Sequence, residues 1–197
     1  MNQAETQWLQ HAIQGDDQAF TNLVEHYQTP VFNLCYRMLG DPQEAEDAAQ
    51  ESFWRAYQSI QRYDPQRPFA TWLLSIAAHY CIDQQRRRRL PSFALDEITE
   101  EIVPDPAPDP EKMVGQIERD RLLHSLLVDM NGQDRAAIIL RYWYDLSEQE
   151  ISEALSLSVS AVKSRLHRAR RLLAERWQEA QPASVNSERN TYGAQSF

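Results

Sequence analysis

The sequence contains few glycines, few cysteines and no long apolar run. Only 5 of the 197 residues are glycine, and no alternation of Val, Ile and Thr indicates β-strands. The two cysteines, Cys35 and Cys81, each lie within an apolar periodic stretch, which favours buried structural thiols over a disulfide or a metal pair. We therefore expect an all-α fold of two small helical domains, with no cofactor and no metal site.

The start of the chain has neither feature of a signal peptide. The segment MNQAETQW lacks a basic patch and an apolar core, and no apolar run approaches the roughly 20 residues that span a bilayer. We expect a cytoplasmic protein without membrane insertion. An enzyme is not indicated, because the sequence has no glycine-rich phosphate loop and no paired metal ligands. No catalytic residue is predicted.

Basic residues are outnumbered by acidic ones, but they are concentrated in two places. The net charge of −9 by itself argues against binding to phosphates. Acidic residues crowd residues 44–51 and 96–111, whereas residues 86–89 and 163–176 are strongly basic. Two basic patches on an acidic chain are compatible with a nucleic-acid partner.

Helical periodicity divides the chain into two parts. Apolar residues recur at helical spacing over residues 5–61, and Gly40 can end one helix. Asp41, Pro42 and Glu44 then supply an N-cap, a first-turn proline and a capping-box partner for the next helix. A further helix is predicted at about residues 69–88. We place a first domain at residues 1–90, a flexible acidic and proline-rich linker at 91–112, a second domain at 113–178 and a disordered tail at 179–197.

The run LSEQEISEALSLSVSAVKSRLHRARRLL, residues 146–173, predicts a helix-turn-helix. Ser147 and Glu150 can form a capping box for a short helix, and Ser158 can cap the longer helix that follows a tight turn. On the longer helix, one face is apolar: Val162, Leu166, Ala169 and Leu173. This geometry places a recognition helix in the major groove of DNA.

The opposite face of the predicted recognition helix is polar and basic. Between residues 163 and 171 there are five Lys or Arg residues and no acid, whereas a merely solvated helix usually mixes both signs. The alternative, that these arginines only solvate a surface helix, remains open at this point. The residues predicted to contact DNA are Ser160, Lys163, Ser164, Arg165, His167, Arg168 and Arg171, with Arg165 and Arg171 assigned to phosphates.

Three motifs in this order narrow the interpretation. They are DPQEAEDAAQESFWRAY, PFATWLLSIAAHYCIDQQRRRR and the helix-turn-helix described above. This order resembles the extracytoplasmic-function (ECF) sigma factors of the sigma-70 family, whose regions 2.2, 2.3 to 2.4 and 4.2 the motifs match in turn. The resemblance implies an alternative, non-enzymatic sigma factor that directs core RNA polymerase to specific promoters and assists promoter melting.

The resemblance also implies which surfaces bind the partners. The first motif would contact the clamp helices of the polymerase's largest subunit through Asp47, Gln50, Glu51, Trp54 and Gln58. The second domain would bind the minus-35 element and the flap of the second-largest subunit. The second motif and the loop before it would bind the minus-10 element through Arg62, Tyr63, Phe69, Trp72, His79, Asp83, Arg86 and Arg87. An anti-sigma factor is a further implied partner.

Some alternatives stay open on the sequence. Trp54 could fold back onto its own domain, and Trp72 and His79 could belong to the core. Family members often carry Gly where this chain has Asp145 and Ser156, and Asn where it has His79. We therefore expect a slightly different turn in the helix-turn-helix. The competing function is a stand-alone helix-turn-helix regulator, which would not need the aromatic and basic helix at residues 69–89 or an exposed Trp54.

Overall fold

The computed structural model describes residues 3–89, 125–127 and 130–180, and every regular element among them is a helix. The elements are α1 (Gln3–Ile13), α2 (Asp17–Leu39), α3 (Pro42–Ser59), the 3-10 turn η1 (Ile60–Arg62), α4 (Phe69–Arg89), α6 (Gly132–Tyr142), α7 (Glu148–Ala154) and α8 (Val159–Ala180). The all-α prediction is confirmed. The predicted linker at 91–112 and almost all of the predicted tail lie outside the described residues.

Local capping signals define the helices of the first half. Asp16 caps α2 by accepting hydrogen bonds from the backbone N–H groups of Gln18 and Ala19, and Gly40 ends it in the left-handed conformation, with φ 92°. Asp41 caps α3, accepting from Glu44 N at 2.8 Å. The predicted stop of α2 at Gly40 and the predicted start of α3 at Asp41 are therefore confirmed, although the Glu44 side chain pairs with Arg88 of α4 instead of completing a capping box.

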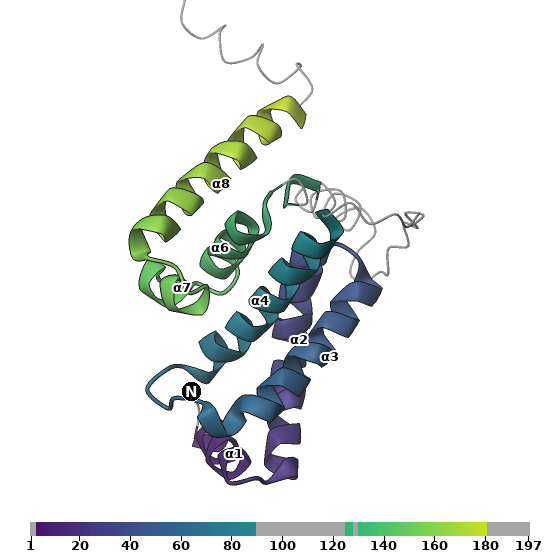
Figure 1. Ribbon diagram of the computed structural model, residues 1–197, viewed down its shortest axis with the longest axis vertical. Coiled ribbons are helices and arrows are strands. Elements are labelled where there is room, and N and C mark those ends of the chain that lie inside the picture. The colour runs from purple at the N-terminus through teal and green to yellow at the C-terminus, as the bar shows by residue number, and fades with distance from the viewer. Residues whose placement is uncertain (1–2, 90–124, 128–129, 181–197) are drawn as a thin grey trace, which may run out of the picture.

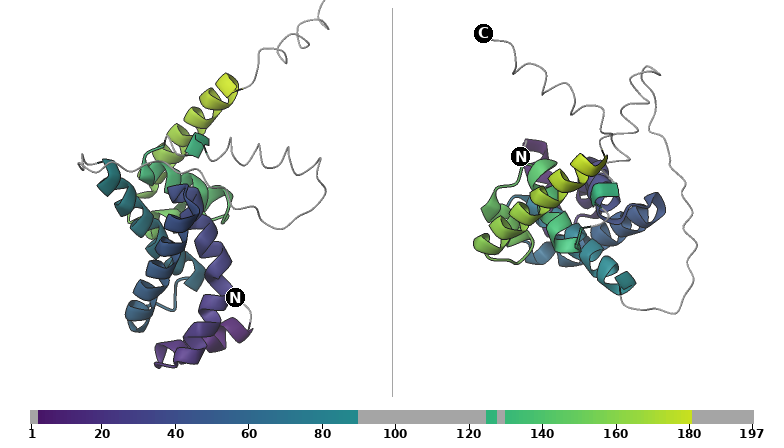
Figure 2. Two further views of the ribbon diagram at one scale, coloured as in Figure 1. Left: turned by 90° about the vertical axis from the view of Figure 1, so that its right-hand side faces the viewer. Right: turned by 90° about the horizontal axis from the view of Figure 1, so that it is seen from above.

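The helices α2, α3 and α4 pack side by side, and α1 crosses the end of α2 (Figures 1 and 2). α3 contributes a face of small residues to this packing, and all of them are buried: Ala45, Ala48, Ala49, Ser52 and Ala56. Small side chains let helix backbones approach closely, so α3 can lie flat against α2 and α4. Its other face is left to solvent.

The two cysteines lie next to each other in this core. Cys35 of α2 and Cys81 of α4 are both fully buried, as expected for structural thiols. Their thiols hydrogen bond to one another, which with burial raises the pKa of Cys81 far above its usual range. The adjacency was not predicted, because residues 46 positions apart in sequence give no spacing signal.

The helices α6, α7 and α8 form the helix-turn-helix unit, and it packs against the first group. Both α6 and α7 contact α4, and α6 also contacts α2 (Figure 1). Buried apolar residues from both halves form one continuous core cluster. α4, the helix predicted to bind the minus-10 element, therefore lies between α2 and α3 on one side and α6 and α7 on the other.

Candidate nucleic-acid and polymerase interfaces

α7 and α8 have the geometry of a helix-turn-helix. Ser147 N donates to Glu150 Oε2 at 2.8 Å while Glu150 N donates to Ser147 Oγ at 3.2 Å, so the predicted capping box is present. Ser158 Oγ accepts from Ala161 N at 3.2 Å and caps α8, again as predicted. Between the helices, Ser156 adopts a left-handed backbone with φ 54°. These local interactions fix the direction in which α8 leaves the turn.

α8 presents one apolar and one basic face. Val162, Leu166 and Ala169 are buried, and Leu173 packs at the edge of the core. Of the residues predicted to contact DNA, all but Arg165 are exposed: Ser160, Lys163, Ser164, His167, Arg168 and Arg171. The tertiary structure therefore leaves this surface, hereafter the basic face of α8, open to a ligand.

Two arginines of α8 converge on one carboxylate of α6. Asp134 Oδ1 accepts from Arg165 Nη1 at 2.8 Å and from Arg168 Nη2 at 3.3 Å, and Asp134 Oδ2 accepts from Arg168 Nε at 3.4 Å. Burial alone would raise the pKa of Asp134, but the hydrogen bonds from Arg165, Arg168 and Asn131 outweigh it and lower the pKa below its ordinary value. The carboxylate is therefore ionised at neutral pH. Arg165, with a side chain only 21% exposed, is turned toward this carboxylate.

The residues predicted to bind the minus-10 element are divided between surface and core. Arg62, His79, Arg86 and Arg87 are exposed, and Asp83 is half-buried and pairs with Arg86 at 3.4 Å. His79 Nδ1 donates to the Ser75 carbonyl at 2.8 Å, but the ring lies on the surface, so the core alternative does not hold for it.

Tyr63, Phe69 and Trp72 form an aromatic cluster at the start of α4. The Trp72 ring lies 5.1 Å from that of Tyr63 and 5.5 Å from that of Phe69. Tyr63 and Phe69 are buried, so their side chains are not presented to a ligand in this arrangement. Trp72 is partly buried and packs against the core. Tyr63 and Phe69 support Trp72 from the core side here, and their assignment to the minus-10 element stays a prediction.

The solvent-facing side of α3 carries an exposed aromatic pair. Trp54 is 55% exposed, so it does not fold back into the core, and its ring stacks on that of Tyr57 with 6.0 Å between centroids. Tyr57 is held in place by its hydroxyl, which donates to Asp17 Oδ1 at 2.7 Å. Asp47, Gln50 and Gln58 are exposed nearby on this helix, and Glu51 pairs with Arg55. An apolar pair ringed by polar side chains is typical of a protein interface.

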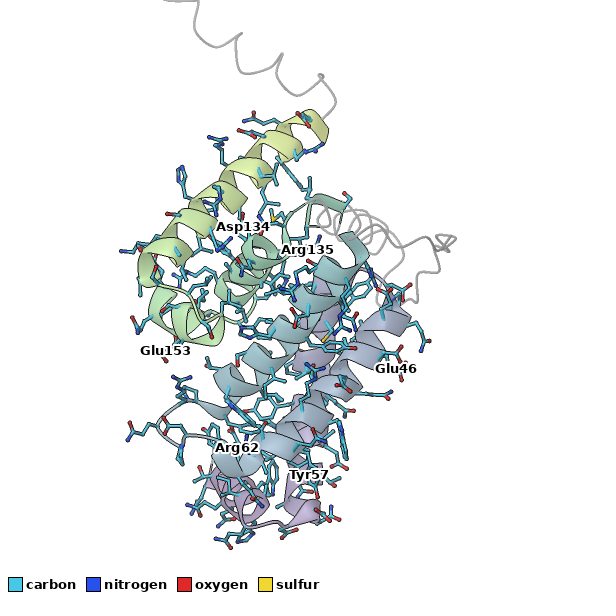
Figure 3. The ribbon with its side chains drawn as sticks, viewed as in Figure 1. Glu46, Tyr57, Arg62, Asp134, Arg135 and Glu153 are labelled. Atoms are coloured by element: carbon cyan, nitrogen blue, oxygen red, sulfur yellow. The ribbon has the colours of Figure 1, made fainter. Side chains whose placement is uncertain are left out.

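Two residues of these surfaces were missed on the sequence. Tyr57 follows Trp54 by three positions on α3, and this i, i+3 spacing could have revealed the pair. Asp134 lies 31 positions before Arg165, and nothing in the local pattern links the two. Figure 3 shows Asp134 on α6 beside α8, a juxtaposition that only the folded chain creates.

Helices able to cross a membrane were not found in the part of the chain that the structure describes. In those same residues, no group of three or more His, Cys, Asp or Glu side chains gathers in a way that could hold a metal ion.

Comparison with protein families matches two segments of the chain. Residues 23–90 match the model of sigma-70 region 2, and residues 120–173 match that of sigma-70 region 4. The first match spans most of α2 together with α3 and α4, and the second contains α6, α7 and most of α8.

Three curated relatives align with this chain along most of their own length. The chain is 37% identical over 174 residues to the ECF RNA polymerase sigma factor SigW of Bacillus subtilis, covering 84% of this chain and 92% of that protein. It is 33% identical to the RNA polymerase sigma-H factor of Pseudomonas aeruginosa, with 86% and 92% covered. Identity to the ECF sigma factor SigX of Bacillus subtilis is 32%, with 80% and 82% covered.

A solved structure has the same fold. The structure of CnrH in complex with the cytosolic domain of CnrY superposes with a TM-score of 0.67 at 24% sequence identity, covering 90% of this chain and 99% of that chain. The sigma factor RpoE of Bartonella quintana, in complex with the anti-sigma factor NepR, gives a TM-score of 0.61 at 17% identity, with 82% and 98% covered.

Proposed function

This chain belongs to the extracytoplasmic-function sigma factors of the sigma-70 family, and we propose from its surfaces how it serves as an alternative sigma factor in transcription initiation. α3 docks on core RNA polymerase, α8 reads the minus-35 element in duplex DNA, and α4 holds the opened minus-10 element. An anti-sigma factor is the regulatory partner that this family membership implies.

The observation that supports this proposal best is the separation of three exposed surfaces on three helices. The basic face of α8 suits the major groove, because hydroxyl, ammonium, imidazole and guanidinium groups can contact base edges or phosphates. The Trp54 and Tyr57 pair on α3 suits a protein partner, since desolvated aromatic residues dominate the binding energy of interfaces. A stand-alone DNA-binding regulator would have no use for the second of these surfaces.

The minus-10 surface combines one partly buried aromatic residue with exposed cations. Trp72 rests on Tyr63 and Phe69, which limits the entropy that it loses when a base stacks on it. Arg62, Arg86 and Arg87 are exposed around α4 and can follow the phosphates of the opened strand. The protein binds the DNA strand of the minus-10 element after it has opened and so stabilises the open state. This role requires no catalytic activity from the protein.

Run-off transcription with bacterial core polymerase tests the proposal. We expect the full chain to start RNA synthesis from specific promoters selected from a pool of random-sequence duplexes. Trp54→Ala should reduce transcripts about tenfold or more at limiting chain concentration, because it removes an interface anchor. Arg168→Ala should cause a loss of about tenfold through lost contacts in the groove.

Matched variants outside the proposed surfaces control for folding. Tyr142→Ala removes another exposed aromatic ring, and Arg176→Ala removes another exposed cation of α8. Neither should change the transcript yield by more than about twofold. Tight sequence-specific binding of duplex DNA without polymerase, together with no transcripts, would instead establish a stand-alone regulator.

A further inference from the structure

Asp134 lies at the junction between α6 and the recognition helix. It occupies the first turn of α6 after the N-cap residue Asn131, whose amide Nδ2 donates to Asp134 Oδ2 at 2.6 Å. Its side chain is only 9% exposed, and both carboxylate oxygens accept hydrogen bonds from α8. The carboxylate is thus held by Asn131 from its own helix on one side and contacted by two arginines of α8 on the other.

The two arginines differ in exposure and in the nitrogen atoms that they direct at Asp134. Arg165 is mostly buried and points Nη1 at Asp134. Arg168 is 56% exposed and turns the edge formed by Nε and Nη2 toward Asp134. Its Nη1 atom has no partner among the residues that the structure describes, so the outer N–H groups of this guanidinium face away from α6. A guanidinium held by one edge has its other edge available for a bidentate acceptor.

We propose that Asp134 is a positioning residue for promoter recognition, which fixes the Arg168 guanidinium so that its outer N–H groups meet one base edge of the minus-35 element. The proposal rests on the function proposed above for α8. Arg165 braces the same carboxylate from the buried side, so that Asp134 cannot rotate away when Arg168 engages DNA.

Two physical effects follow from this arrangement. Pinning a long side chain before binding removes rotamer freedom that would otherwise be lost on the DNA, which favours the one geometry that matches the base. The carboxylate also cancels one positive charge on the basic face of α8, which weakens attraction to phosphates of any sequence. Both effects raise the ratio of specific to non-specific binding.

The substitution Asp134→Asn separates these effects from simple packing. It keeps the size of the side chain and its oxygen acceptor, but it removes the charge that holds two guanidinium groups. We expect discrimination at one base pair of the minus-35 element to fall about tenfold, within the range of a lost bidentate base contact. We also expect non-specific duplex binding to rise and its dependence on salt to steepen by roughly one released ion.

The test uses full-length chain with bacterial core polymerase and a promoter pool with randomised upstream elements. The wild-type chain first selects its preferred minus-35 sequence, and all single-base variants of that sequence are then transcribed with each protein variant. Arg168→Ala should lose discrimination at the same base pair as Asp134→Asn, and the double variant should lose no more than Arg168→Ala alone.

Glu179→Gln is the matched control. It also removes one carboxylate that pairs with an arginine of α8, Arg176 at 3.7 Å, but outside the proposed DNA-contacting residues. This variant should discriminate between bases as the wild type does. Unchanged discrimination in Asp134→Asn, or an equal further loss in the Arg168→Ala background, would overturn the positioning role and leave Asp134 as a packing residue only.

The possible outcomes also distinguish a failure of the positioning role of Asp134 from a failure of the proposed sigma-factor function. If the wild-type chain yields no promoter-dependent transcripts, the proposed function fails. If it yields them and Asp134→Asn discriminates as well as the wild type, only the positioning role fails. Should Asp134→Asn not fold, Asp134→Glu keeps the charge but moves the carboxylate by one methylene, and unchanged discrimination in that variant would equally overturn the inference.

Discussion

Two residues of the helix-turn-helix unit hold a backbone conformation that normally favours glycine. Asp145 and Ser156 have φ values of 51° and 54°. Ser156 follows the C-cap of α7, where Leu157 N donates back to the Ser152 carbonyl at 2.9 Å and closes the helix end. These are the two positions at which the sequence departs from the Gly common in its family. The fold therefore keeps the left-handed turn at a cost in backbone energy.

Ser156→Gly should stabilise the protein. A left-handed conformation costs a non-glycine residue about 1–2 kcal/mol, and glycine relieves this cost. Part of the relief is offset because glycine has more conformational freedom in the unfolded chain. We expect the free energy of unfolding to rise by up to about 1 kcal/mol in urea denaturation. Ser164→Gly, on an exposed helical position of α8, should lower it by about 0.5 kcal/mol. A decrease in both variants would show that the Ser156 backbone is not strained in solution.

The short helix α7 depends strongly on its capping box. With only seven residues, it is too short to be stable alone, and the Ser147 and Glu150 side chains satisfy backbone N–H groups at its start. The hydrogen bonds from the Ser147 hydroxyl and backbone lower the pKa of Glu150 below its ordinary value. Because the folded pKa is below the unfolded one, the contribution of Glu150 to stability is present at neutral pH and is lost as pH falls through the folded pKa.

Glu150→Gln should therefore reveal a pH-dependent contribution. At pH 7 we expect the variant to lose about 0.5 kcal/mol of unfolding free energy, since an anion near a helix N-terminus is favourable and Gln retains the hydrogen-bond acceptor. The difference from wild type should shrink as pH falls through the lowered pKa of Glu150, where the wild-type carboxyl becomes protonated. Urea denaturation at several pH values measures it. Glu153→Gln removes a charge from the same helix outside the capping box, and an equal loss there would mean that the box is not the cause.

The whole molecule is organised by contacts between its two matched regions. The Arg135 guanidinium of α6 donates to the Met38 carbonyl near the end of α2, and the Tyr144 hydroxyl donates to the Pro30 carbonyl at 2.6 Å. The Arg37 guanidinium lies over the Trp143 ring, 5.2 Å from its centroid. Burial raises the pKa of Tyr144 well above its usual range, so this hydroxyl remains a donor. These contacts hold α6 and the turn that follows it against α2.

Tyr144→Phe tests whether the two regions pack together in solution. The change removes one hydrogen bond across the contact and keeps the ring, so we expect a loss of about 1 kcal/mol of unfolding free energy. Amide hydrogens of α2 around Pro30 should also exchange faster. Tyr142 precedes Tyr144 by two positions and its ring is exposed. Tyr142→Phe is therefore the control and should change neither the unfolding free energy nor the exchange rates. Identical behaviour of the two variants would mean that the regions are not docked.

Much of the fold could be predicted because the signals involved are local. The caps at Asp41, Ser147 and Ser158, the stop at Gly40 and the apolar face of α8 each depend on residues within a few positions of one another. The exposure of Trp54 followed from the small-residue face of α3 on its opposite side. Local spacing gave no indication that Tyr63 is buried, because its ring packs against Phe69 and Trp72 of α4, which follow a loop.

The helices, the caps at Asp41, Ser147 and Ser158, the helix-turn-helix and the family could all be inferred from the sequence, because hydrophobic periodicity and capping act over one or two turns of chain. Folding brings together side chains that the sequence does not connect: Cys35 meets Cys81, Asp134 binds Arg165 and Arg168, and Tyr144 reaches Pro30. These pairs are separated by 31 to 114 positions. Such contacts form only when amphipathic helices bury their apolar faces together, and no local pattern specifies which polar groups are then brought side by side.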